Sequence, residues 1–232
     1  MNNAIIGIVG RCGLSQFNKT SIEVFDNFRI ATIKSGGNPI LILPPQTIEY
    51  YNLSPKETPK LTDKEKQILD EQLKLCHGII MPSGTKRFEY DNYICDYCNK
   101  NKIPLLGICM GMQIMCNYDN ENINIKIEDN SHYSTDLYKH DVKIDKSSKL
   151  YQILNEESIQ VNSWHHYCVS NSGSYKIAAK NNDIIEAVEK EGNFNIGFQW
   201  HPEKNIDNDI NSQKIFKAFI DSAIEYKKTH LN

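Results

Sequence analysis

Short apolar runs alternate with segments of helical periodicity along the first half of the chain. Four runs predict buried strands, at residues 5–9, 39–43, 77–81 and 103–106. Apolar spacing, turn glycines and a Thr-x-x-Glu capping pattern predict helices between them, at residues 22–33, 62–75 and 91–102. Strands that alternate with helices pair in parallel through right-handed crossovers. We therefore expect an α/β fold, a doubly wound (flavodoxin-like), mostly parallel sheet with flanking helices.

The second half of the chain has shorter runs separated by polar turns. Strands are predicted at residues 139–144, 158–161, 175–179, 184–188 and 194–200, with a short helix at 148–154. An amphipathic helix is predicted at 208–228, and the Asn-, Asp- and Glu-rich residues 117–130 predict a solvated excursion with one short strand at 123–127. The strand meander indicates a small antiparallel extension of the sheet. Without an internal repeat or linker, a single domain over residues 1–232 is expected.

Composition narrows the function classes. The chain has 232 residues, 40% of them hydrophobic, and a formal net charge of -3, so no strong field favours nucleic acid or an anionic membrane surface. No stretch approaches a membrane span of about 20 apolar residues, and the N-terminus lacks the features of a signal peptide. Seven cysteines without a disulfide-like framework favour a reducing compartment. We expect a cytoplasmic protein.

Gly107-Ile108-Cys109-Met110-Gly111 lies where the fourth predicted strand meets a predicted helix. A cysteine between two glycines at such a turn is the pattern of a nucleophile elbow, whose sharp bend requires small neighbours. The helix N-terminus favours a thiolate, and the N–H of Met110 follows the nucleophile, where an oxyanion hole needs a donor. The alternative is a buried structural cysteine, which the glycine frame disfavours.

The second candidate motif is Gln199-Trp200-His201-Pro202-Glu203, at the end of the last predicted strand. In an extended segment, residues two apart project to the same side, so Glu203 is able to orient the imidazole of His201. His201 then serves as the base for the Cys109 thiol and the acid for a leaving amine. A surface His-Pro-Glu is the alternative, and the elbow cysteine favours catalysis.

Together these residues resemble a known family. Residues 107–113 and 199–203 are similar to the class I glutamine amidotransferase superfamily. Residues 162–166, Asn-Ser-Trp-His-His, with 140–144, 148–150, 6–8 and 35–44, resemble its γ-glutamyl-γ-aminobutyrate hydrolase and γ-glutamyl hydrolase family. The resemblance spans almost the whole chain.

The resemblance implies a catalytic triad of Cys109, His201 and Glu203. It implies an oxyanion hole formed by the N–H groups of Gly84 and Met110. It also implies that Gln113 and His165 bind the substrate.

The implied reaction is cleavage of a γ-glutamyl amide through a γ-glutamyl thioester, without a cofactor. Residues 116–121 and Tyr167 depart from the family pattern on the substrate side, which leaves the amine product open.

Other side chains have a structural interpretation beside a functional one. His165 and His166 are candidate metal ligands together with His201 and Glu203. However, adjacent histidines at a strand end usually point apart, and no carboxylate or cysteine lies at a familiar metal spacing. We expect no metal, one of the two lining the pocket and the other structural. Cys95-x-x-Cys98 lies within a predicted helix and is expected to be structural. Lys86-Arg87, just after Gly84, is either a substrate-carboxylate contact or an exposed pair.

Three functions follow, in order of preference. The first is a stand-alone cysteine hydrolase of γ-glutamyl amides such as γ-glutamyl-γ-aminobutyrate. The second is the glutaminase subunit of a two-protein amidotransferase, and the third a non-catalytic binding protein on the same fold. The expected partner is a small γ-glutamyl molecule, with no nucleic acid and no membrane, and a homodimer is allowed.

Overall fold

A nine-stranded sheet forms the centre of the computed structural model, which describes residues 3–54, 58–118 and 124–230. Its strand order is β4-β1-β5-β6-β13-β12-β11-β8-β9. The first five strands pair in parallel: β4 (Asn38–Ile42), β1 (Ile5–Val9), β5 (Gly78–Met81), β6 (Leu105–Ile108) and β13 (Asn195–Phe198). The other four pair antiparallel: β12 (Ile184–Glu189), β11 (Lys176–Asn181), β8 (His140–Ile144) and β9 (Ser158–Val161). The expected α/β class, with an antiparallel extension, is confirmed.

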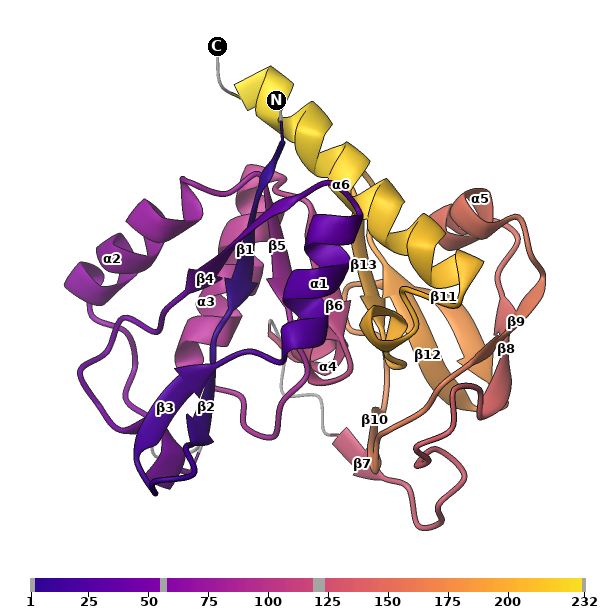
Figure 1. Ribbon diagram of the computed structural model, residues 1–232, viewed down its shortest axis with the longest axis horizontal. Helices are drawn as coiled ribbons and strands as arrows, with labels where there is room; N and C mark the ends of the chain where they lie inside the picture. The colour runs from indigo at the N-terminus through magenta and orange to yellow at the C-terminus, as the bar shows by residue number, and fades with distance from the viewer. Residues whose placement is uncertain (1–2, 55–57, 119–123, 231–232) are drawn as a thin grey trace.

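Helices cover both faces of this sheet (Figure 1). One face packs on α1 (Asp26–Lys34), α5 (Lys149–Leu154) and the long C-terminal α6 (Ile210–His230), in a core that includes Phe28, Phe216 and Phe219. The other face packs on α2 (Asp63–Leu73), α3 (Glu89–Asn101) and α4 (Met110–Asn117), in a core that includes Leu69 and Ile94. The capping box predicted at Thr62 is present, because its side chain accepts from the N–H of Glu65. The chain also forms two short 3-10 helices, η1 (Tyr50–Asn52) and η3 (Pro202–Lys204).

Two small two-stranded sheets lie outside the central sheet, and the first of them changes a predicted helix. The expected helix over 22–33 begins only at Asp26, because residues before it form a hairpin of β2 (Arg11–Leu14) and β3 (Thr20–Glu23), in which Ile22 pairs with Cys12. A second small sheet pairs β10 (Tyr167–Val169) with β7 (Asn124–Lys126). The strand predicted at 123–127 is thus present in its described part, whereas residue 123 lies outside the described residues.

The carboxyl ends of three neighbouring strands meet at one edge of the sheet. Met81 of β5 pairs with Gly107 of β6, and Ile108 of β6 pairs with Phe198 of β13. Parallel strands end on the same side, and open α/β sheets bind their ligands there. The segments that follow these three strands are therefore brought together, although they lie far apart in the sequence.

Gly111 lets the first turn of α4 lie directly against β5. A Cβ atom at this position would overlap the carbonyl oxygen of Met81, and a Cβ at Gly107 would lie 2.9 Å from the backbone of Gly111. Both obstacles include backbone atoms, which cannot rotate away as a side chain can. The two glycines of the Gly-x-Cys-x-Gly pattern are thus required by close packing of the helix on the strands.

No helix in residues 3–54, 58–118 and 124–230 combines the length and the apolar character needed to cross a membrane.

We expect Gly111→Ala to lower the free energy of unfolding by about 1–3 kcal/mol, the usual range for overpacking, despite the better helix propensity of alanine. Chemical denaturation measures this loss. Gly78→Ala is the control, since its Cβ would meet only side chains, at 3.0 Å or more. An equal loss in both variants would contradict the packing argument.

Candidate active site

Cys109 lies at the turn between β6 and α4 in a backbone conformation that is rare for a side chain other than glycine. Its φ is 53° and its ψ is -108°. The turn is held on both sides, because the Cys109 N–H donates to the carbonyl of Phe198 at 2.7 Å and the Cys109 carbonyl accepts from the N–H of Gln113 at 3.1 Å. Strain of this kind persists only where the surroundings impose it, and it is common at active sites. The thiol is partly exposed.

His201 and Glu203 form a buried pair just beyond β13. The strand ends at Phe198 and Pro202 begins η3, and the His201 Nδ1 lies 2.7 Å from a carboxylate oxygen of Glu203. The two residues are 4% and 1% exposed, so water screens their interaction little. Burial alone would lower the pKa of the imidazole, but the Glu203 carboxylate and the Cys109 sulfur raise the pKa of His201 to about 10. The site therefore favours an imidazolium beside the cysteine.

Asn162 fixes the backbone of His201. Its side-chain amide donates to the His201 carbonyl and its side-chain oxygen accepts from the His201 N–H, both at 2.8 Å. Asn162 follows β9, at the far side of the sheet, and is buried. In the sequence, Asn162 stands out only as part of a motif that resembles the family. Its positioning role becomes visible only when the two strand ends are seen together.

The two predicted oxyanion donors lie near each other. Met110 is the first residue of α4, where the N–H groups have no partner within the helix. Gly84 follows β5 by three residues, and a Cβ placed on it would lie 2.7 Å from the side chain of Met110. Their assignment as the oxyanion hole stays a prediction.

A cavity of about 900 Å³ opens beside these groups. Cys109, His201, Glu203 and Gly84 line it, as do Lys204 and a wall of aromatic side chains. The aromatic and cationic residues that line it include Phe25, Tyr133, Trp164, Arg11, Lys86 and Lys204.

Three cations border this cavity, and they differ in their partners. The Arg11 guanidinium is paired with Asp91 and donates to the carbonyl of Pro82, at 3.1 Å. The Lys86 ammonium donates to two carbonyls of the segment around η1. The Lys204 ammonium lies 3.0 Å from the ring centre of Trp164 and, among the described residues, has no carboxylate partner. Lys204 is therefore the cation of this cavity that is free to pair with an anion, and no sequence motif singles it out.

The two predicted substrate-binding side chains lie outside the lining of this cavity. The Gln113 amide donates to the Tyr167 carbonyl and to Gln199, at 3.0 and 3.1 Å, and accepts from Asn124. His165 is buried beside Glu186 rather than beside Cys109. The geometry gives both residues internal contacts, and their substrate-binding role stays a prediction.

Of the remaining candidates, Arg87 is held by Asn92 and by the carbonyl of Asn117, away from the cavity. Cys95 and Cys98 are fully buried in α3, and burial raises the pKa of both thiols. Cys12, Cys76, Cys95, Cys98, Cys109 and Cys168 are free thiols.

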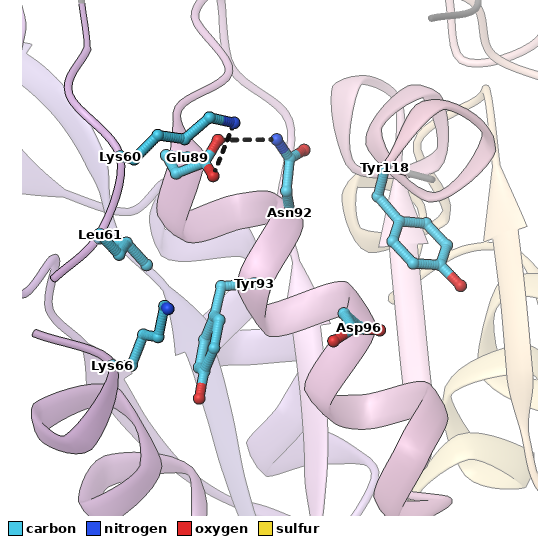
Figure 2. Close-up of a pocket in the computed structure, with 8 residues that line it drawn as sticks. All are labelled: Lys60, Leu61, Lys66, Glu89, Asn92, Tyr93, Asp96 and Tyr118. Atoms are coloured by element: carbon cyan, nitrogen blue, oxygen red, sulfur yellow. Dashed lines mark hydrogen bonds and ion pairs between the residues drawn. The ribbon is translucent and has the colours of Figure 1, made fainter. Parts of the chain in front are cut away.

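A second pocket, of about 310 Å³, lies between the start of α2 and α3 (Figure 2). The Glu89 carboxylate, which lines this pocket, accepts hydrogen bonds from the Lys60 ammonium at 3.0 Å and from the Asn92 amide at 3.3 Å. It contains no member of the predicted triad. The larger cavity is therefore the candidate active site.

Comparisons with known proteins agree with this geometry. The profile of the Peptidase C26 family matches residues 64–203. A glutamine amidotransferase-like protein of Rickettsia prowazekii is 27% identical, with 85% of this chain and 88% of that protein covered. The γ-glutamyl-CDP-amidate hydrolase of Campylobacter jejuni is 28% identical, with 58% of each chain covered.

The chain covers about half the length of some curated relatives but nearly the whole of the solved structures. The chain spans 54% of a Schizosaccharomyces pombe relative that is 31% identical, and little more of the Campylobacter protein. The glutaminase domain of CTPS from Trypanosoma brucei, solved with bound acivicin, superposes with a TM-score of 0.64 at 17% identity, covering 96% of this chain and 94% of that one. This likeness shows a shared fold.

The family match runs from the helix before β5 through the elbow to Glu203, and so contains every residue of the predicted triad and oxyanion hole. The chain belongs to the Peptidase C26 family of class I glutamine amidotransferase-like hydrolases.

Proposed function

We propose that the protein is a cysteine hydrolase that cleaves the γ-glutamyl amide bond of a small γ-glutamyl compound, releasing glutamate and an amine. The observation that supports this most directly is the meeting of two strand ends. Cys109, after β6, and the His201–Glu203 pair, after β13, line one cavity of about 900 Å³. A nucleophile, an acid–base group and a carboxylate that orients it are the parts required for acyl transfer.

In the proposed reaction, the Cys109 thiolate attacks the γ-carbonyl carbon of the substrate. The C=O electron pair moves to oxygen, and the N–H groups of Gly84 and Met110 stabilise the oxyanion, which is worth about 10²–10³ in rate per donor. The tetrahedral intermediate collapses, the C–N bond breaks, and the His201 imidazolium donates its proton to the amine. A γ-glutamyl thioester remains on Cys109.

Hydrolysis of the thioester uses the same groups in reverse. Neutral His201 takes a proton from water as the water attacks the thioester carbonyl, and collapse of the second intermediate releases glutamate and the Cys109 thiolate. Glu203 keeps the imidazole in one orientation through both halves, since its oxygen accepts from Nδ1 at 2.7 Å. Nε2 is thereby left for the reacting atoms.

The amine product is proposed to be γ-aminobutyrate-like, that is, an amine with its own carboxylate. The cation of Lys204 lines the cavity one residue after Glu203 and suits such a group. The name of the Campylobacter relative is consistent with γ-glutamyl chemistry. Seven cysteines without a disulfide-like spacing in the sequence favour a reducing, cytoplasmic setting.

A second function is favoured by one specific observation. The superposition on the CTPS glutaminase domain covers nearly the whole of both chains, so the fold also suits a glutaminase that passes ammonia to a synthase partner.

The decisive test incubates the purified protein with a panel of γ-glutamyl amides and measures released glutamate. We expect turnover of γ-glutamyl-γ-aminobutyrate by the wild type, none by Cys109→Ala, and an adduct on Cys109 whose mass corresponds to a glutamyl thioester in trapped wild type. Cys12→Ala is the matched control, because Cys12 lines the same cavity but follows no elbow. Equal activity of wild type and Cys109→Ala would contradict the proposal, and activity on glutamine alone would favour the glutaminase.

Replacing Glu203 changes the pH range over which His201 is protonated. The carboxylate raises the pKa of His201 to about 10, so in Glu203→Gln this pKa should fall toward or below its usual value of 6.5. The general acid is then lost above neutral pH, and the alkaline limb of kcat/KM moves to lower pH. NMR titration of the His201 ring, assigned with His201→Gln, measures the pKa directly. An unchanged alkaline limb together with an unchanged pKa would contradict the proposed pairing.

Lys204→Met removes the ammonium but keeps a flexible stem against Trp164. We expect KM for γ-glutamyl-γ-aminobutyrate to rise about tenfold, the scale of a partly exposed charged hydrogen bond, with kcat nearly unchanged. Steady-state kinetics measure both constants. Lys190→Met is the control, since that ammonium also lies over aromatic rings, Tyr118 and Tyr175, but outside the cavity. A fall in kcat at constant KM would instead place Lys204 in the chemical step.

A further inference from the structure

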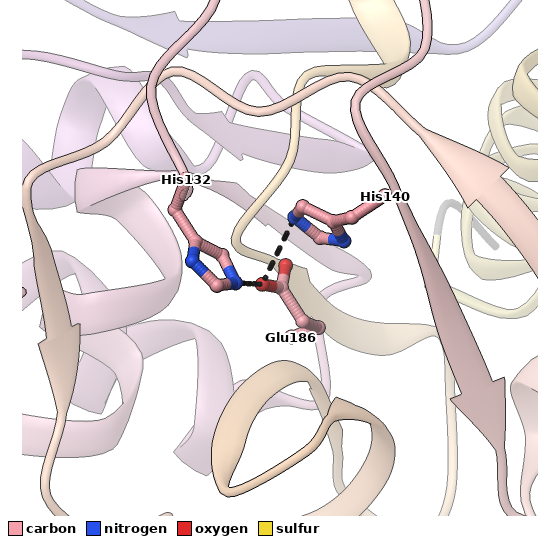
Figure 3. A group of neighbouring side chains, drawn as sticks. All are labelled: His132, His140 and Glu186. Atoms are coloured by element: carbon pink, nitrogen blue, oxygen red, sulfur yellow. Dashed lines mark ion pairs between the residues drawn. The ribbon is translucent and has the colours of Figure 1, made fainter. Parts of the chain in front are cut away.

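Four buried side chains converge at a point in the antiparallel half of the protein. The Nε2 atoms of His132, His140 and His165 lie 3.3, 3.5 and 3.8 Å from the same carboxylate oxygen of Glu186. Figure 3 shows the rings of His132 and His140 turned toward that oxygen from two different segments. Glu186 is 0% exposed and His165 is 5% exposed, so bulk solvent does not reach their polar atoms.

These contacts are poor hydrogen bonds. In the described part of the chain, none of the three Nε2 atoms has a hydrogen-bond partner of good geometry, and neither carboxylate oxygen of Glu186 has one. An N–H···O hydrogen bond has a length of about 2.7–3.2 Å. Buried polar atoms without partners are rare because they are costly, so this cluster requires a missing partner.

The other ring nitrogens indicate where the protons are. The Nδ1 atom of His140 lies 3.3 Å from the Asp141 carbonyl, and that of His165 lies 3.1 Å from the Tyr167 carbonyl. A carbonyl accepts only, so each Nδ1 bears a proton, and in the neutral form of the ring Nε2 directs its lone pair toward the cluster. Lone pairs and a carboxylate then face one another, an arrangement that a cation stabilises. Fixing of the tautomer through Nδ1 is how metal-bound histidines are oriented.

The spacing also fits a metal ion. Zinc bonds to nitrogen and oxygen are about 2.0–2.2 Å long, which places neighbouring ligands of a tetrahedral site roughly 3.3–3.5 Å apart. The separations of His132 and His140 from the Glu186 oxygen match this edge. His165 has to move further than these two, since its Nε2 lies 3.8 Å from the Glu186 oxygen and it falls outside the set of ligand atoms that all lie within 4.8 Å of one another. One candidate ligand atom each from His132, His140 and Glu186 also lies within 4.8 Å of the others.

We propose that His132, His140, Glu186 and His165 bind one divalent transition-metal ion of the zinc type. Three imidazoles and one carboxylate fill four positions, so the site is closed and structural, as zinc sites without an open position are. The His140 side chain, 11% exposed, provides the entry. The ligands differ from those weighed from the sequence, since His165 is directed toward Glu186 rather than toward His201.

The proposed ion would fix one wall of the candidate active site. Tyr133 and Trp164, which line the cavity, each adjoin a ligand, and their backbones form a β-bridge with the rings 6.3 Å apart. The His165 N–H donates to the His132 carbonyl at 2.9 Å, so two ligands are already joined through the backbone. A bound ion would hold both aromatic side chains in place without touching the substrate.

The test measures metal binding independently of hydrolysis, on the full chain without a polyhistidine tag. We expect about one Zn²⁺ per chain by mass spectrometry of the metal content, as for a four-ligand site. After chelation, added Co²⁺ should give the visible bands of a tetrahedral nitrogen and oxygen site, without the near-ultraviolet band of thiolate ligation. Free Zn²⁺ at about 100 times Kd should raise Tm by roughly 5–10 °C.

Variants of the cluster separate this site from surface binding. Glu186→Gln and His140→Gln should lose the Co²⁺ bands, whereas His166→Gln should keep them, since His166 is exposed and stacks on Tyr133 outside the cluster. If the variants do not fold, the Co²⁺ bands and the Zn²⁺-dependent Tm of the wild type test the proposal by themselves. Chelated wild type that is folded, binds no Co²⁺ and shows no change of Tm with Zn²⁺ would overturn the proposal in favour of a carboxylate neutralised by protonated histidines. Bands that survive in folded Glu186→Gln would overturn it too.

Discussion

The parallel pairing of β6 with β13 is the interaction on which the candidate site depends. It places Ile108 opposite Phe198, and the hydrogen bond from the Cys109 N–H to the Phe198 carbonyl extends the ladder one residue beyond the end of β6. Because the strands run in the same direction, the residues after both ends emerge at the same edge. A slip of the register by one residue would turn these side chains to the other face. The separation of Cys109 from His201 is therefore set by backbone pairing before any side chain contributes.

The electrostatics of the site depend on burial at that edge. A carboxylate that is 1% exposed is costly unless it has a partner, and Glu203 has one in His201. The same burial strengthens the pair, which explains why the pKa of His201 is raised although desolvation of the imidazole acts in the opposite direction. Asn162 prevents relaxation of the arrangement, since it holds both backbone groups of His201. Geometry and charge thus depend on one another here.

Much of this could be predicted from the sequence, for a physical reason. The four inner parallel strands, β1, β5, β6 and β13, are almost fully buried, so they appear as continuous apolar runs. The elbow glycines are local requirements of one turn. The hairpin of β2 and β3 was missed because Ile22 and Phe25 have helical spacing by coincidence, whereas pairing with Cys12 decides the structure. The contacts of Asn162, Lys204 and Glu186 depend on which strands become neighbours. Single-sequence patterns do not encode that information.

Both halves of the sheet contribute residues to the lining of the cavity. The parallel strands lead into Cys109, Gly84 and His201, the proposed nucleophile, oxyanion donor and acid–base group, whereas the antiparallel extension supplies Trp164 and the segment that bears Tyr133. The halves are joined at β12 and β13, where the Gln199 N–H donates to the carbonyl of Glu186 at 2.8 Å. A rearrangement around the Glu186 side chain would therefore act on the backbone two residues from His201. The antiparallel half thus contributes one aromatic wall of the cavity, whereas the proposed triad and Lys204 follow strands of the parallel half.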